Sequence, residues 1–170
     1  MSRAMSRRSD YQTIPVSFTL NGRLQELEVE PHELLLDVVR ERLGLTGAKR
    51  SCDVEVCGAC TLLVDGRPVS ACTTLAVEVR DRSVLTIEGL ASDGKLHPLQ
   101  EAFIEHGGFQ CGFCTPGMIL AAKALLDENP DPTEAELKHF MHGNVCRCTG
   151  YKKIIESIMA AAKSMRGAQQ

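Results

Sequence analysis

Residues 47–72 read GAKRSCDVEVCGACTLLVDGRPVSAC and contain four of the eight cysteines of this 170-residue chain. The four are Cys52, Cys57, Cys60 and Cys72. Their spacing is Cys-x4-Cys-x2-Cys and then a fourth cysteine after eleven residues. This is the plant-type arrangement for the ligands of a [2Fe-2S] cluster. Gly58 is expected to let the loop backbone approach the cluster closely, because glycine has no Cβ.

Two other uses of these cysteines fit the spacing less well. Structural zinc sites usually take two paired cysteine knuckles rather than this arrangement. Disulfides require an oxidising compartment and give no reason for three thiols within one short loop. The spacing therefore predicts an iron–sulfur site.

Composition narrows the class of protein. The net charge is −3, with 24% charged residues and no tryptophan. A nucleic-acid surface is not indicated, because there is neither a basic excess nor aromatic interleaving. No apolar run is long enough to cross a bilayer. The first residues include Arg7-Arg8 but lack the hydrophobic segment of a twin-arginine signal. We expect residues 1–11 to be a disordered tail and the protein to be cytoplasmic.

In the first half of the chain, apolar and polar residues alternate as they do in β-strands. Residues 14–30 predict a hairpin around Asn21-Gly22, and residues 34–44 have the spacing of an apolar helix face. After the cysteine loop, residues 61–71 predict a second hairpin and residues 84–87 a last strand. This order of elements is that of a β-grasp ferredoxin domain, which we expect to span residues 12–90.

The second half has helical rather than strand periodicity. Four helical segments are predicted: one over residues 98–106, one opened by Thr115-Pro116, one opened by a Thr133/Glu136 capping box, and one after Gly150. We expect a four-helix domain over residues 91–165 and a tail over residues 166–170. The predicted fold class is therefore α+β.

The other four cysteines lie in this helical half. Cys111 and Cys114 precede the second helix, and Cys146 and Cys148 precede the fourth. Helix N-termini favour a bound anion, and a reducible anionic cluster is stabilised there. The spacing favours an iron–sulfur cluster but leaves a four-thiolate zinc site open, since both metals accept four thiolates.

No arrangement of side chains predicts catalysis by this chain. The five histidines lie outside both cysteine sets, so we interpret them as surface or helix-end residues. Nucleophile triads, phosphate-binding loops and isolated carboxylate pairs are not recognisable in the sequence. The chain is expected to lack an active site of its own.

Three segments together carry a family resemblance. They are CDVEVCGAC at 52–60 with Cys72, QCGFCTPGMI at 110–119 and GNVCRCTGY at 143–151. In combination they resemble the iron–sulfur subunit of molybdenum hydroxylases, the xanthine dehydrogenase, carbon monoxide dehydrogenase and aldehyde oxidoreductase family. The resemblance covers residues 14–162. Ser51 is a departure, since many relatives carry glycine before the first ligand.

The resemblance implies an electron-transfer subunit of an oxidoreductase. A plant-type ferredoxin domain would hold one [2Fe-2S] cluster on Cys52, Cys57, Cys60 and Cys72. A helical domain would hold a second on Cys111, Cys114, Cys146 and Cys148. Electrons would pass from molybdopterin through both clusters to FAD. Gln110 and Cys148 match the family positions nearest the pterin.

The resemblance also implies partners. Because the chain has 170 residues, it resembles the bacterial branch with a separate large molybdopterin subunit and medium FAD subunit, assembled as a dimer of heterotrimers. The alternatives are a free-standing two-cluster ferredoxin, with a polar, acidic docking face, and a structural zinc module. A subunit should instead expose apolar surface that its partners cover.

Overall fold

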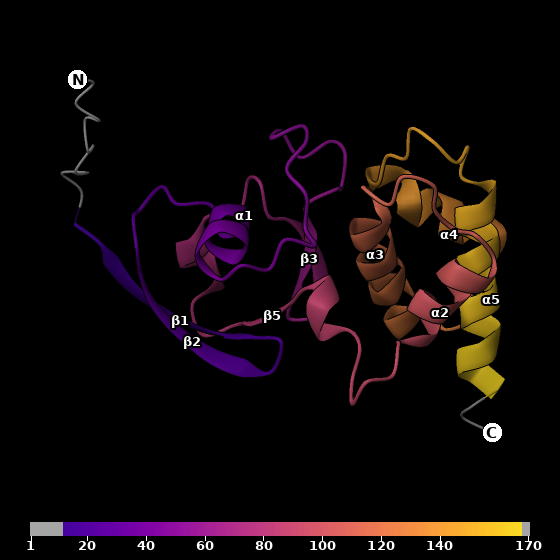
Figure 1. Cartoon of the computed structure of the whole chain (residues 1–170), viewed down its shortest axis with the longest axis horizontal. Coiled ribbons are helices and arrows are strands. Elements are labelled where there is room, and N and C mark those ends of the chain that lie inside the picture. The colour runs from indigo at the N-terminus through magenta and orange to yellow at the C-terminus, as the bar shows by residue number, and fades with distance from the viewer. Residues whose placement is uncertain (1–11, 168–170) are drawn as a thin grey trace, which may run out of the picture.

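The computed structural model describes residues 12–167, and the predicted tail at residues 1–11 lies outside that range. The elements of the first half are β1 (Ile14–Leu20), β2 (Arg23–Val29), α1 (Leu35–Asp37), η1 (Val38–Arg42), β3 (Thr61–Val64), β4 (Arg67–Ser70), η2 (Ala76–Val79), β5 (Ser83–Leu85) and η3 (Ile87–Gly89). Those of the second half are α2 (Pro98–Glu105), α3 (Thr115–Glu128), α4 (Glu134–Phe140), η4 (Met141–Gly143) and α5 (Lys152–Gly167). Figure 1 shows the sheet at one end of the molecule and the helices at the other.

The five strands form one mixed sheet in the order β2-β1-β5-β3-β4. β1 pairs antiparallel with β2 and parallel with β5, and β3 pairs antiparallel with both β4 and β5. The predicted Asn21-Gly22 turn is confirmed, with φ of 50° and 79°. Asn21 also ties this turn to the end of β5, because its side-chain amide exchanges hydrogen bonds of 3.0 and 2.9 Å with Thr86.

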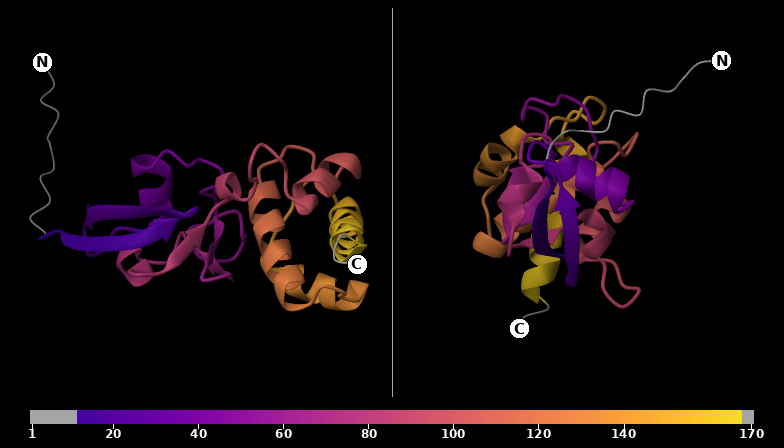
Figure 2. Two further views of the ribbon diagram at one scale, coloured as in Figure 1. Left: turned by 90° about the horizontal axis from the view of Figure 1, so that it is seen from below. Right: turned by 90° about the vertical axis from the view of Figure 1, so that its left-hand side faces the viewer.

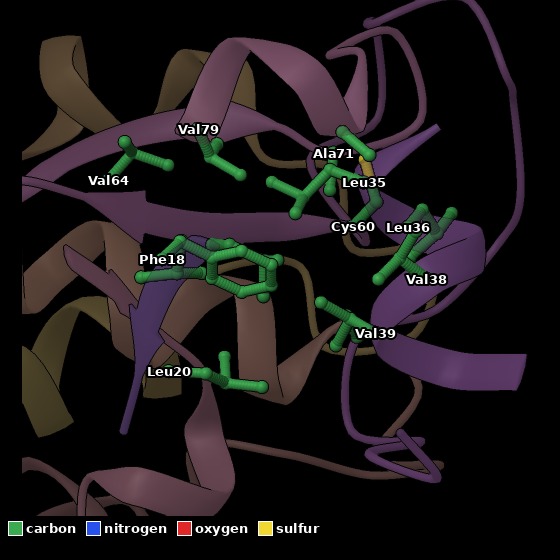
Figure 3. Close-up of a cluster of buried hydrophobic side chains, with 14 of the residues drawn as sticks. Phe18, Leu20, Leu35, Leu36, Val38, Val39, Cys60, Val64, Ala71 and Val79 are labelled. Carbon is green, nitrogen blue, oxygen red and sulfur yellow. The ribbon is translucent and has the colours of Figure 1, made fainter. Parts of the chain in front are cut away.

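The sheet core follows from alternation along β1. Val16, Phe18 and Leu20 are buried on one face, as the period-2 pattern requires. Figure 3 shows side chains of α1 and η1 beside Phe18, and it places Cys60 beside Ala71 within this core. Two cysteines of the predicted site, Cys60 and Cys72, are therefore anchored in the hydrophobic core rather than in a surface loop.

The four predicted helices of the second half are present, and their caps explain where two of them begin. The Thr133/Glu136 capping box is confirmed: Thr133 N–H donates to Glu136 Oε2 at 2.7 Å, and Glu136 N–H donates to Thr133 Oγ1 at 3.3 Å. At the start of α2, His97 Nδ1 accepts from Leu99 N–H at 3.2 Å. This agrees with the helix-end interpretation of His97.

Helix α3 joins the two halves. It is apolar on nearly every side, which is typical of a buried helix, and Figure 2 shows it between the sheet and the other helices. Leu120 and Ala124 belong to the core of the sheet, whereas Met118 and Ala122 belong to the core of the helices. One helix therefore fixes the two halves against each other.

Mixed sheet plus helices confirms the α+β class, and the local differences from expectation are small. The segment predicted as one helix over residues 34–44 is a short α-turn followed by a π-helical turn. The last strand ends at Leu85, and Ile87–Gly89 is 3-10 helical. Helix α5 continues through Gly167. Between residues 12 and 167, none of the helices combines the length and apolar character needed to cross a membrane.

Candidate metal centres

The first four cysteines converge from three parts of the sheet domain. Cys52 and Cys57 lie on the loop before β3, Cys60 directly precedes β3, and Cys72 follows β4. Their thiols gather in two pairs, because Cys52 interacts with Cys57 and Cys60 with Cys72. The hairpin of β3 and β4 returns Cys72 to the loop, as predicted.

The loop around Cys52 is built to present backbone N–H groups. Asp53, Glu55 and Gly58 have φ of 55°, 60° and 67°, and such left-handed residues between others turn successive N–H groups toward one concave side. Val56 N–H donates to Cys52 Sγ at 3.4 Å. Backbone hydrogen bonds, first from Val54 and then from Val56, lower the pKa of Cys52 to about 6. The backbone of this loop therefore favours the thiolate form of Cys52 without help from a metal.

An ion-pair cluster holds this loop to the helix behind it. Arg50 Nη1 donates to Asp53 Oδ1 at 2.7 Å, and its Nη2 donates to Asp37 of α1. Hydrogen bonds to Asp53 and then Asp37 raise the pKa of Arg50 above its already high ordinary value. Because the guanidinium stays charged and offers a planar fork, it can hold two carboxylates at once.

The second four cysteines converge from two loops of the helical domain. Cys111 and Cys114 precede α3, and Cys146 and Cys148 follow η4. They too form two pairs: Cys148 Sγ lies 3.5 Å from Cys111 Sγ, and Cys114 interacts with Cys146. Cys114 is the N-cap of α3, so one pair does lie at a helix N-terminus. The pair predicted to lie at the N-terminus of α5 is farther from that helix in sequence, since α5 begins only at Lys152.

Burial gives the thiols within each set different pKa values. It raises the pKa of Cys60 to about 12 and that of Cys114 to about 12. Burial also disfavours the Cys146 thiolate, but hydrogen bonds from Thr149 and from nearby backbone N–H groups outweigh it and lower the pKa of Cys146. Buried thiols such as Cys60 and Cys114 ionise when a cation binds them, because metal coordination removes the proton.

The chemistry of both sets fits a binuclear cluster. Each set holds its four thiols as two pairs. Two thiol pairs are what two irons require, since each iron of a [2Fe-2S] cluster takes two protein ligands. The buried Thr115 hydroxyl, next to Cys114, has no hydrogen-bond partner among the described protein atoms. A cluster sulfur would supply an acceptor there.

A short junction connects the two cysteine loops. Val145 N–H donates to the Cys57 carbonyl at 2.9 Å, and the buried Asn144 amide donates to the Gly58 carbonyl at 3.2 Å. Gly58 is needed here for close approach to the other loop, since a Cβ would lie 2.4 Å from Asn144 Nδ2. Gly117 is needed for the same reason, since its Cβ would lie 2.2 Å from Gly58 O.

Sequence reasoning missed three residues of these sites: Asn144, Gly117 and Thr149. Each lies inside a segment quoted for the family resemblance, and glycine in the first turn of a helix is itself a signal of close packing. Gln110 and Cys148, the predicted pterin contacts, are both exposed. They lie on the same pair of loops, because Cys148 contacts Cys111.

Two four-thiol sites, one on a mixed-sheet domain and one on a helical domain, define a two-cluster iron–sulfur protein. Two families match accordingly: the 2Fe-2S iron–sulfur cluster binding domain over residues 18–88 and the [2Fe-2S] binding domain over residues 86–159. The nicotinate dehydrogenase small FeS subunit of Eubacterium barkeri is 49% identical, over 88% of this chain and 96% of that protein. The nicotine 6-hydroxylase small subunit of Paenarthrobacter nicotinovorans is 45% identical, over 92% and 94%. The chain belongs to the family of small iron–sulfur subunits of molybdenum hydroxylases.

Solved structures agree with this assignment. Quinoline 2-oxidoreductase from Pseudomonas putida 86 superposes with a TM-score of 0.88 at 45% identity, covering 94% of this chain and 99% of that one. The aldehyde oxidoreductase of Desulfovibrio desulfuricans gives a TM-score of 0.87 at 46% identity, covering 90% of this chain but 17% of that longer one. The protein is therefore an oxidoreductase subunit with two [2Fe-2S] domains, and its role is electron transfer.

Proposed function

We propose that this chain carries electrons from a molybdopterin centre on a large partner subunit to FAD on a medium partner subunit, in a dimer of such heterotrimers. Residues 12–90 form a β-grasp, plant-type ferredoxin domain, and residues 91–165 form a four-helix cluster-binding domain. The first cluster is held by Cys52, Cys57, Cys60 and Cys72, and the second by Cys111, Cys114, Cys146 and Cys148. When bound, each cluster supplies a one-electron carrier.

The observation that carries this proposal is the junction between the two cysteine loops. Cys57 and Cys146 belong to different sets, yet only Val145 and one backbone hydrogen bond of 2.9 Å separate them. The bond is supported by the buried Asn144 amide and by the close approach of Gly58 and Gly117. An electron carrier needs its two sites close together and rigidly spaced, and this junction supplies both.

Exposed apolar side chains around the second set support a subunit rather than a free carrier. Phe109 and Phe113 are 41% and 45% exposed on the loop that carries Gln110 and Cys111. Val145 is 45% exposed on the facing loop. Apolar groups beside a redox site are typical of a surface that a partner covers. We assign Gln110 and Cys148 to contact with the pterin at this surface.

The loop of the first set has an exposed apolar edge of its own. Val54 and Val56 are 64% and 63% exposed on either side of Glu55. They lie in the same loop as Cys52 and Cys57, whereas Cys60 and Cys72 are buried. We assign this edge to the FAD-binding partner, because it is the outward side of the first set.

The test is native purification of the protein through a tag on this chain. Dithionite-reduced samples should show two distinct [2Fe-2S] EPR signals and about four irons per chain. Molybdenum and flavin should copurify in equal amounts. Cys60→Ser should remove one EPR signal and Cys114→Ser the other, so each variant is the control for the other.

The outcomes separate the proposal from its alternatives. Two cluster signals without molybdenum, flavin or partner chains would establish a free two-cluster ferredoxin instead. Zinc in place of iron in the second set would overturn the assignment of that cluster. If Cys60→Ser removed the same signal as Cys114→Ser, the assignment of ligands to two separate clusters would be wrong.

A further inference from the structure

Three hydrogen bonds form a closed ring around Cys146. Cys146 N–H donates to the Tyr151 hydroxyl at 3.0 Å. Tyr151 N–H donates to Thr149 Oγ1 at 3.2 Å. Thr149 Oγ1 lies 3.1 Å from Cys146 Sγ. The ring closes within six residues and uses backbone and side-chain groups of the same three residues.

The ring fixes the direction of the Thr149 hydroxyl. A hydroxyl has one proton to donate and two lone pairs that accept. The backbone N–H of Tyr151 can only donate, so it occupies a lone pair of Thr149 Oγ1. A cysteine thiolate bound to metal can only accept. The single proton of Thr149 is therefore directed at Cys146 Sγ.

The backbone is held in an unfavourable conformation to make this arrangement. Gly150 and Tyr151 have φ of 62° and 67°. Glycine adopts such values freely, but Tyr151 has a Cβ and adopts them only where its surroundings enforce them. The N–H and the hydroxyl of Tyr151 are used in the ring, and its carbonyl accepts from Ile155 N–H of α5 at 2.9 Å. These three hydrogen bonds explain how the turn is kept. Cys146 is only 8% exposed, so water competes weakly for its sulfur.

We propose that Thr149 sets the reduction potential of the second cluster through Cys146 Sγ, and that Tyr151 is the residue that positions Thr149. This inference rests on the proposed function, because it requires a [2Fe-2S] cluster on this set. Reduction adds negative charge to a cluster, and hydrogen bonds to its sulfurs stabilise the reduced form. Thr149 therefore raises the potential of the second cluster.

This hydrogen bond lies on the side of the second cysteine set that faces the first set. Cys146 is the member of its set that neighbours Val145, whose N–H contacts the Cys57 carbonyl of the other set. Cys148, by contrast, is exposed and pairs with Cys111 on the outer side. The hydroxyl therefore stabilises charge on the side of the second set that faces the first.

The test is a redox titration of the complete, partner-bound protein, with the two cluster signals followed by EPR. Thr149→Val keeps the shape of the side chain and removes its proton. We expect the second signal to be reduced only at a lower potential, with a three- to ten-fold change in its reduced-to-oxidised ratio at fixed potential, ten-fold being 59 mV for a one-electron couple. Thr149→Ser should restore the wild-type midpoint, and the first signal should not shift.

The other possible results of this titration would overturn either the role of Thr149 or the proposed function. If Thr149→Val loads both clusters and the second midpoint is unchanged, the inference is wrong while the proposed function stands. If the Thr149→Val variant does not take up the second cluster, Thr149→Ala is used instead, and the midpoint of the second signal is again expected to fall. If neither loads and only serine does, the hydroxyl serves assembly rather than potential, and the inference falls. Absence of a second signal from the wild-type protein would instead overturn the proposed function.

Discussion

Substitution of Gly117 by alanine tests the junction between the two cysteine loops. The added Cβ would lie 2.2 Å from Gly58 O and 3.3 Å from Gly58 C. Both atoms are backbone, so no side chain can rotate away. Contacts below 3.0 Å are essentially never adopted by a Cβ. The first turn of α3 and the loop at Gly58 must therefore move apart by most of an ångström.

The magnitude follows from two opposing effects. Overpacking of a rigid contact costs about 1–3 kcal/mol, and the better helix propensity of alanine offsets at most about 1 kcal/mol. The net destabilisation of the junction lies between about 0 and 3 kcal/mol. The middle of that range, about 1–2 kcal/mol, corresponds to a roughly 5- to 30-fold larger population of the open form of the junction. The bond from Val145 N–H to the Cys57 carbonyl lies across the same contact and should open with it.

Hydrogen exchange of the cluster-loaded protein measures this opening directly. The peptide that contains Val145 should exchange roughly 5- to 30-fold faster in Gly117→Ala, and the EPR spin–spin interaction between the two reduced clusters should weaken. Gly143→Ala is the matched control, because no atom lies within 4 Å of its added Cβ. If Gly117→Ala exchanged at the same rate as Gly143→Ala, the close contact would not hold the junction and the reasoning would be refuted.

Two further predictions concern the first cysteine loop and helix α2. Gly58→Ala combines a φ of +67° with a Cβ only 2.5 Å from Gly143 O, so the first cluster should fail to load. Iron analysis should then find about half of the four irons that two clusters contain. Full iron content would contradict this prediction. Burial lowers the pKa of His97 below its ordinary 6.5, and only unprotonated Nδ1 can accept from Leu99 N–H. The unfolded chain therefore binds more protons, so the stabilising contribution of His97 is complete above about pH 6.5 and is lost as the pH falls from there through the lower folded pKa. In denaturant titrations His97→Ala should cost about 1 kcal/mol, and His97→Asn should keep the cap but lose this pH dependence; an unchanged dependence would show that another group titrates.

Local patterns accounted for most of the elements. The Asn21-Gly22 turn, the capping box at Thr133 and the four helices of the second half depend on residues close together in the chain. The spacing of the first cysteine set predicted its cluster, whereas the cluster of the second set was predicted mainly from the family resemblance. The least accurate part was the segment at residues 34–44, where α1 passes into the π-helical η1. Apolar spacing alone does not distinguish these two kinds of helical turn.

The packing of α3 against both halves could not be read from periodicity. An apolar helix indicates burial, but nothing in its spacing says that Leu120 meets the sheet while Met118 meets the helices. The sequence also gave no account of Asn144, which hydrogen-bonds to Gly58 across a separation of 86 residues. Such contacts depend on how two domains meet, and no local propensity encodes them.

Residue identity indicated the chemistry of the protein: the spacing of the first four cysteines is that of a plant-type [2Fe-2S] cluster, and the segments around the other four carry the family resemblance. Tertiary structure alone decided how the two sites are joined and how their thiols differ. It buries Cys60 and Cys114, surrounds Cys52 with backbone N–H groups, and closes the hydrogen-bond ring at Cys146. The reason is physical: spacing specifies which atoms can bind a metal, whereas burial and hydrogen bonding, which set potentials and distances, arise only when distant segments pack together.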